Sequence, residues 1–167
     1  MYRKLEDFYR DWAYESEGTL KLINMCTDES LNQKITPDGR SLAFLADHLS
    51  KTIVEMMDLT GLKVDGKDYK EPVPNTVKEI AEDYKKASDS LIENLKQNWT
   101  DEMLNNSEDN MYGEVWKKGQ TLIYLLLHQT HHRGQMTVLM RQAGLKVSGI
   151  YGPAKEEWEA MGMPALE

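Results

Sequence analysis

The sequence predicts an all-α fold and, within that class, a four-helix bundle. Four long segments repeat their apolar residues at steps of three and four, the period of an amphipathic helix, and no segment shows the alternation typical of a strand. Four such segments without a sheet bury their apolar faces against one another. The chain has 167 residues, about the size of one domain, so we expect a single domain over residues 1–167.

The first predicted helix covers residues 5–25. Its apolar positions recur with helical spacing, and most of its charged residues fall off that stripe. Gly18 lies inside the segment, where a glycine costs roughly 1 kcal/mol relative to alanine. The stripe consists of Leu5, Phe8, Trp12, Thr19, Leu22 and Ile23, and the charged Glu15 also falls on it.

The second predicted helix begins after Ser41, which occupies the N-cap position, and ends near Thr60, with Gly61 as its stop. A turn at residues 36–39 precedes it. The polar segment 63–74 that follows contains glycine and two prolines. Its length indicates a crossover connection rather than a tight hairpin.

The third predicted helix is capped by Asn75 or Thr76 and ends near Gln97. Glu79, three residues after Thr76, completes a capping box. Thr100 then starts one short helical turn.

The fourth long helix follows a polar loop at residues 105–113. It starts at Val115 or Lys118 and runs to Ala143, and Gly144 is well placed to end it. The residues beyond it predict a turn and one more helical turn. We expect the tryptophans to pack the ends of the bundle; they are Trp12, Trp99, Trp116 and Trp158.

The composition excludes several classes of protein. Lys and Arg total 20 against 28 Asp and Glu, a formal net charge of −8, and a surface of that sign repels the phosphates of nucleic acids. No apolar run approaches the roughly 20 residues that span a bilayer, and the first residues lack the apolar stretch of a signal peptide. The lone Cys26 has no disulfide partner and no neighbouring base, so we interpret it as a structural thiol. We expect a soluble, cytoplasmic protein without nucleic-acid or membrane partners.

Three of the four histidines lie within five residues, in the string His128-Gln-Thr-His131-His132. Residues four apart stack on one face of a helix, so His128 and His132 point the same way and continue the apolar stripe of the fourth helix. His48 lies on the inward stripe of the second helix. Two imidazoles from one helix and one from another can therefore meet inside the bundle.

This spacing favours a metal site. Divalent transition metals bind imidazole nitrogens at about 2.0–2.1 Å, and an i, i+4 pair supplies two neighbouring ligands without backbone strain. Buried imidazoles without partners each cost on the order of 1–3 kcal/mol, a cost that coordination removes. We therefore predict a divalent metal held by His48, His128 and His132, with a position left open as in catalytic sites. Imidazole ligands suit zinc, nickel, iron or copper almost equally.

The neighbouring polar residues have competing interpretations. A histidine on an apolar face is often only a satisfied core residue, and spacing alone does not decide between His131 and His132 as ligand. The apolar register favours His132 and leaves His131 as a pocket-wall, interface or merely exposed residue. Gln135, one turn beyond, either hydrogen-bonds a metal-bound ligand or bridges helices. We interpret Arg133 and Arg141 as surface or cap residues, with pairing of Arg133 to an acidic residue of another helix as the alternative.

The string of residues 128–135 in the predicted fourth helix, together with His48 in its Ala-Asp-His-Leu context, resembles the DinB superfamily. The C-terminal Gly-Ile-Tyr-Gly-Pro and Glu-Trp segments are also similar to that family, and the resemblance extends from Arg40 to Trp158. The string is His128-Gln-Thr-His131-His132-Arg133-Gly134-Gln135.

The resemblance implies an up-up-down-down bundle whose long crossover is the segment 63–74. It implies a divalent metal, commonly zinc or nickel, held by His48, His128 and His132. It also implies a homodimer and, where the family has assigned activities, S-transfer or isomerisation that depends on small thiols such as bacillithiol or mycothiol.

Two functions follow from these observations. The first is a metal-dependent thiol transferase or hydrolase, in which the cation lowers the pKa of a bound thiol or water and the resulting nucleophile attacks a small electrophile. Its candidate catalytic residues are His131 and Gln135, for orientation or proton transfer. The second is a non-catalytic metal-binding module of the stress response. A helical regulator that binds DNA or protein rests on helical content alone.

Overall fold

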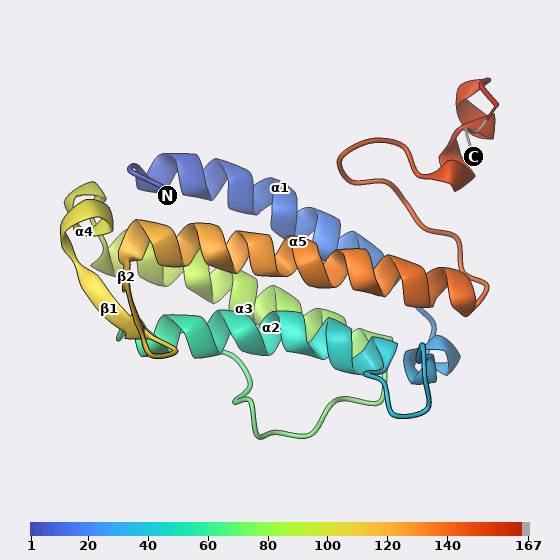
Figure 1. The fold of residues 1–167 in the computed structure, drawn as a ribbon, viewed down its shortest axis with the longest axis horizontal. Coiled ribbons are helices and arrows are strands. Elements are labelled where there is room, and N and C mark those ends of the chain that lie inside the picture. The colour runs from blue at the N-terminus through green and yellow to red at the C-terminus, as the bar shows by residue number, and fades with distance from the viewer. Residues whose placement is uncertain (165–167) are drawn as a thin grey trace.

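The computed structural model describes residues 1–164, which form a bundle of four long helices (Figure 1). The predicted all-α class and four-helix bundle are confirmed, and the last three residues of the predicted 1–167 domain lie outside the described residues. The long helices are α1 (Leu5–Asn24), α2 (Leu42–Leu59), α3 (Val77–Asn98) and α5 (Lys118–Gln142). The shorter elements are α4 (Asp101–Asn106), β1 (Glu108–Met111), β2 (Glu114–Lys117) and the 3₁₀ turns η1 (Glu29–Asn32), η2 (Lys155–Glu157) and η3 (Glu159–Met161).

The helices run up-down-down-up, so the expected up-up-down-down order is wrong. α1 and α5 lie side by side in the same direction, because Tyr2 pairs with Gly119 near their starts and Glu15 pairs with Arg133 further along both. α2 and α3 both begin at the opposite end of the bundle (Figure 1). The physical reason is that residues 25–41 reverse the chain between α1 and α2. Among the connections between the four long helices, all of which lie within residues 1–164, the predicted crossover between α2 and α3 is the one that spans the bundle.

The ends of the long helices follow the predicted signals. Ser41 accepts a hydrogen bond at 3.1 Å from a backbone N–H in the first turn of α2, and Thr76 accepts one from the N–H of Glu79 at 3.3 Å in α3. Gly61 and Gly144 have positive φ and follow the last residues of α2 and α5 by two positions. Glycine adopts this conformation without strain, so both helices stop where the sequence indicates.

The crossover of residues 60–76 packs along the bundle. The ammonium group of Lys51 in α2 donates a hydrogen bond to the backbone carbonyl of Glu71 at 2.6 Å. Gly66 approaches α2 so closely that a Cβ there would lie 2.5 Å from a methyl group of Val54. The crossover is therefore a fitted part of the bundle, and it covers one side of α2.

A β-hairpin occupies the region predicted as a polar loop, residues 105–113, and the start of the predicted fourth helix. β1 and β2 are antiparallel, with Glu108 opposite Lys117 and Met111 opposite Glu114. Each strand has four residues, and five of the eight are polar, so the sequence shows no alternation of apolar residues that would predict the strands. The hairpin closes one end of the bundle and contacts α2 and α5.

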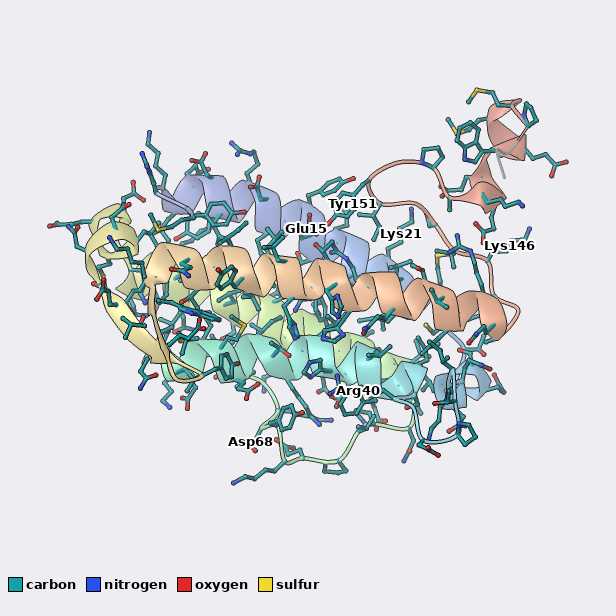
Figure 2. The ribbon with its side chains drawn as sticks, in the orientation of Figure 1. Glu15, Lys21, Arg40, Asp68, Lys146 and Tyr151 are labelled. Carbon is teal, nitrogen blue, oxygen red and sulfur yellow. The ribbon has the colours of Figure 1, made fainter. Side chains whose placement is uncertain are left out.

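Arg133 is the main correction inside the bundle. Its side chain is 3% exposed and forms an ion pair with Glu15 of α1, so the surface interpretation is wrong and the alternative pairing is confirmed. Arg133 also donates a hydrogen bond to the hydroxyl of Tyr151 at 2.5 Å, and Glu15 and Tyr151 lie close together between α1 and the segment after α5 (Figure 2). Arg141 is a surface residue as predicted and pairs with Glu156 at 2.8 Å.

The apolar core lies between the four long helices, and it includes the predicted apolar residues Leu5, Phe8, Trp12, Leu22 and Ile23 of α1. Trp12 is buried and its indole N–H donates a hydrogen bond to Ser88 of α3 at 2.9 Å. Cys26 is buried, and burial raises the pKa of its thiol to about 11, which is the behaviour of a structural thiol. Within residues 1–164, no helix is both long and apolar enough to cross a membrane.

Candidate metal centre

Three histidines meet between α2 and α5. The Nε2 atom of His128 lies 3.2 Å from that of His48 and 3.1 Å from that of His132. One nitrogen of each ring lies within 4.8 Å of those of the other two. His132 is buried, and the other two are half-buried. The structure therefore brings together the three residues that the sequence predicts as metal ligands.

The convergence follows from the register of two antiparallel helices. The two α5 histidines of the cluster are one turn apart on one face. The amide of Gln129, next to His128, donates a hydrogen bond at 2.9 Å to the backbone carbonyl of Leu49, next to His48. Its oxygen accepts a hydrogen bond from the hydroxyl of Tyr84 at 3.3 Å. Sequence reasoning missed Gln129, because it lies within the polar string of residues 128–135 and nothing in the sequence sets it apart from its polar neighbours.

The spacing of the rings fits a divalent transition metal. Two nitrogens bound to one ion at about 2.0–2.1 Å lie roughly 3.3 Å apart in tetrahedral geometry and roughly 2.9 Å apart in octahedral geometry. Two of the three separations, 3.2 Å between His48 and His128 and 3.1 Å between His128 and His132, lie between these values, and the nitrogens of the third pair lie within 4.8 Å of each other. Three imidazoles are also a donor set that zinc, nickel, iron and copper accept. The residues present therefore fit a bound cation.

Burial keeps the imidazoles of the cluster neutral. Desolvation, with a smaller contribution from the ring of His132, lowers the pKa of His48 to about 4 and that of His128 to about 3. Desolvation also lowers the pKa of His132, against the opposing effect of its hydrogen bond to Gln135. A neutral imidazole offers a lone pair, so near pH 7 no proton has to leave these rings before a cation binds.

Gln135 links His132 to His131. Its side-chain oxygen accepts a hydrogen bond from Nδ1 of His132 at 2.6 Å, and its amide nitrogen lies 3.1 Å from Nε2 of His131. With its Nδ1–H engaged, His132 keeps the lone pair of Nε2 directed at the other two rings. Of the two candidate catalytic residues, Gln135 thus touches a ring of the cluster, and the exposed His131 touches Gln135 and packs edge-on against His132.

The other two rings have different supports. Phe44, one turn before His48, stacks on its ring at 5.6 Å, and the guanidinium of Arg40 lies 4.8 Å from the Phe44 ring; Figure 2 shows Arg40 at the start of α2. The hydroxyl of Thr52 lies 3.4 Å from Nδ1 of His48. Among the described residues, Nδ1 of His128 is buried without a hydrogen-bond partner. His128 is therefore the ring of the three whose outer nitrogen has no hydrogen-bond partner among the described residues.

A cavity of about 360 Å³ extends from the cluster toward the hairpin. This volume falls in the range of small-molecule sites. Sequence reasoning missed its far end, because Trp116 was expected to pack an end of the bundle and Tyr112 falls in the predicted loop. The hairpin brings both into the wall of the cavity. The lining residues are His48, Thr52, Glu55, Met56, Tyr112, Trp116, Tyr124 and His128.

Comparisons with known proteins agree with this architecture. The model of the DinB family matches residues 1–165. The uncharacterized protein YrdA of Bacillus subtilis (strain 168) is 44% identical over 167 residues, which cover 99% of this chain and 98% of YrdA. Both solved structures described next are of DinB-like proteins.

The first, from Bacillus cereus ATCC 10987, superposes with a TM-score of 0.86 and 42% identity, over 90% of this chain and 100% of that one. The second, YjoA of Bacillus subtilis, superposes with a TM-score of 0.67 over 88% of this chain and 98% of that one. Its identity is 16%, so this second likeness concerns the fold alone.

Proposed function

This chain belongs to the DinB family, and from that premise we propose that it is a metal-dependent enzyme built on an open three-histidine centre. The reaction we propose is the transfer of a small thiol to a small electrophile. The thiol is a low-molecular-weight cosubstrate, and the electrophile occupies the cavity beside the cluster.

One observation carries the proposal: three imidazole nitrogens converge at the end of a cavity of small-molecule size. Structural zinc sites are usually closed by four protein ligands, whereas catalytic sites keep a position for water or substrate. His48 and His128 belong both to the cluster and to the cavity wall. A ligand in the cavity therefore reaches the cluster directly, as a substrate of such a centre must.

A divalent cation held by the cluster supplies, when bound, a positive charge that lowers the pKa of a thiol or water beside it. The chain's own residues hold that cation and orient the rings that bind it. His48, His128 and His132 hold the cation, and Gln135 fixes His132 in the tautomer whose Nε2 is free. Gln135 is therefore a positioning residue in this proposal.

The transfer itself forms a carbon–sulfur bond as the bond from that carbon to its leaving group breaks. The leaving group keeps the electron pair of the broken bond: a halide departs to solvent, whereas an epoxide oxygen stays in the product and takes up a proton from water. The thiol gives up its proton in this step. In this proposal His131 passes that proton to solvent, because it is an exposed imidazole that packs against the cluster and contacts Gln135. His131 lies outside the metal-holding set in this assignment.

Metal content and turnover, measured on one preparation, test the proposal. The full chain is purified without a metal-affinity column and analysed for zinc, nickel, iron and copper. It is then assayed with several low-molecular-weight thiols against epoxides and halogenated aromatic compounds. We expect a stoichiometric divalent ion and thiol-dependent turnover, and we expect His128→Ala to lose both.

His131→Ala is the matched control, since it removes an imidazole of the same helix that holds no cation in this proposal. It should keep the metal and lose part of the turnover. Stoichiometric metal without turnover for any thiol would favour a non-catalytic metal-binding module instead. A folded protein with no divalent ion would overturn both functions.

A further inference from the structure

The end of the cavity away from the histidines gathers aromatic rings and one carboxylate from three elements. Tyr112 lies in the turn of the hairpin, Trp116 in β2 and Tyr124 in the second turn of α5, while Glu55 comes from α2. We call this set the aromatic end of the cavity. None of these four residues has a role in the reaction proposed above.

The three rings are inclined to one another. The ring of Trp116 meets that of Tyr124 at 76° with centroids 4.6 Å apart, and meets that of Tyr112 at 60° with centroids 6.1 Å apart. Tyr112 is 56% exposed and Tyr124 40% exposed, so a substantial part of each tyrosine stays open to a ligand. Faces of aromatic rings carry partial negative charge and attract cations.

Tyr112 occupies a backbone conformation that aromatic residues seldom adopt. Tyr112 and Gly113, the two residues of the hairpin turn, have φ of 56° and 88°. Turns with positive φ at both positions strongly prefer Asn-Gly. A non-glycine residue in this region costs on the order of 1–3 kcal/mol, and such residues cluster at ligand sites. The chain thus keeps a tyrosine ring at the cavity at a conformational cost.

Glu55 gives the aromatic end of the cavity a negative charge. Among the described residues that line the cavity, Glu55 alone is acidic, and none is a lysine or an arginine. Its half-buried carboxyl interacts with the phenol of Tyr112. A half-buried carboxylate beside aromatic faces attracts an organic cation by two independent effects, ion pairing and the cation–π interaction.

We propose that the aromatic end of the cavity binds the ammonium group of a small organic cation. Glu55 lies seven residues after His48 on α2, about 10 Å along the helix axis. A molecule of that length, with its ammonium group at Glu55, presents its other end to the imidazoles. The position of the ammonium group stands by itself, whereas the role of the other end as substrate rests on the proposed function.

Choline is the probe for this site, and 3,3-dimethylbutan-1-ol is its neutral counterpart of the same shape. Each is titrated into the full chain, both chelator-treated and zinc-loaded, and binding is followed by the NMR shift of the Trp116 indole N–H. We expect choline to bind at least about tenfold more tightly than the neutral alcohol, in both forms of the protein. Equal affinities, or no binding of choline, would overturn the proposal.

Variants assign the binding to this end of the cavity. Glu55→Gln keeps the shape and removes the charge, and we expect it to weaken choline binding about tenfold while leaving the alcohol unchanged. Trp116→Leu, followed by calorimetry because the reporter is lost, should weaken choline as well. Glu93→Gln, an exposed glutamate on α3, is the matched control. Equal choline affinity in Glu55→Gln and Glu93→Gln would refute the assignment.

The test of the ammonium site and the test of the proposed enzyme can give opposite results. Zinc binding that is lost in His128→Ala, together with indifference to the charge of the probe, would leave the metal centre standing and remove the ammonium site. Charge-selective binding to a chain that holds no divalent ion would do the reverse. Circular dichroism confirms that each variant is folded before its affinity is compared.

Discussion

Replacement of Gln135 by leucine tests whether the hydrogen bond behind His132 tunes the centre. The oxygen of Gln135 lies 2.6 Å from Nδ1 of His132 and, among the described residues, is the hydrogen-bond partner of that nitrogen. Loss of such an outer partner typically weakens metal binding 10- to 100-fold, or about 1.4–2.7 kcal/mol. The short distance and the buried ring place Gln135→Leu toward the upper half of that range.

The assay is a competition titration of zinc between the protein and a chromophoric chelator. Gln135→Glu should bind zinc at least as tightly as the unchanged protein, because a carboxylate accepts the Nδ1 proton more strongly than an amide. Gln142→Leu, at an exposed glutamine near the end of the same helix, is the control and should change nothing. The reasoning fails if Gln135→Leu binds zinc as tightly as Gln142→Leu. It also fails if Gln135→Leu and Gln142→Leu lose the same amount of zinc affinity.

Three further outcomes are expected. Glu15→Ala leaves the buried Arg133 guanidinium without its counter-charge and should cost about 3–5 kcal/mol of unfolding free energy in urea; adding Arg133→Met in the same chain should restore much of it, and an additive double variant would contradict the pairing. The metal-free protein should lose stability as the pH falls from about 6.5 toward 3. The folded-state pKa of His48 is about 4 and that of His128 about 3, so the unfolded chain binds protons first. The free energy of unfolding should depend less steeply on pH in this window for His128→Leu, and an equal slope would contradict the lowered pKa values. Tyr112→Asn should raise the stability by about 1 kcal/mol by relieving the positive φ, and a lower melting temperature would show that the tyrosine carries no strain.

The long helices and the histidine cluster were predictable from the sequence because each depends on local spacing. Ser41, Gly61 and Gly144 mark helix ends through the hydrogen bonds and φ angles of neighbouring residues. His128 and His132 share a face through the pitch of one helix. The approach of His48 needed only the further assumption that two apolar stripes pack together.

The features that were missed depend on contacts between distant parts of the chain. The direction of α2 relative to α1 depends on how residues 25–41 turn, which apolar periodicity does not encode. Arg133 looks like a surface residue until its partner Glu15, more than a hundred positions away, is placed beside it. The hairpin that carries Tyr112 and Trp116 is too short and too polar to show a strand pattern.

The adjacency of the first and last long helices has a consequence for synthesis on the ribosome. While α5 is still being made, α1 has no neighbour on that side and α2 carries one imidazole alone. Docking of α5 completes the buried interior and the trio of imidazoles together. A nascent or truncated copy therefore leaves apolar surface open to chaperones and proteases, and it lacks the full set of three imidazoles until α5 has docked.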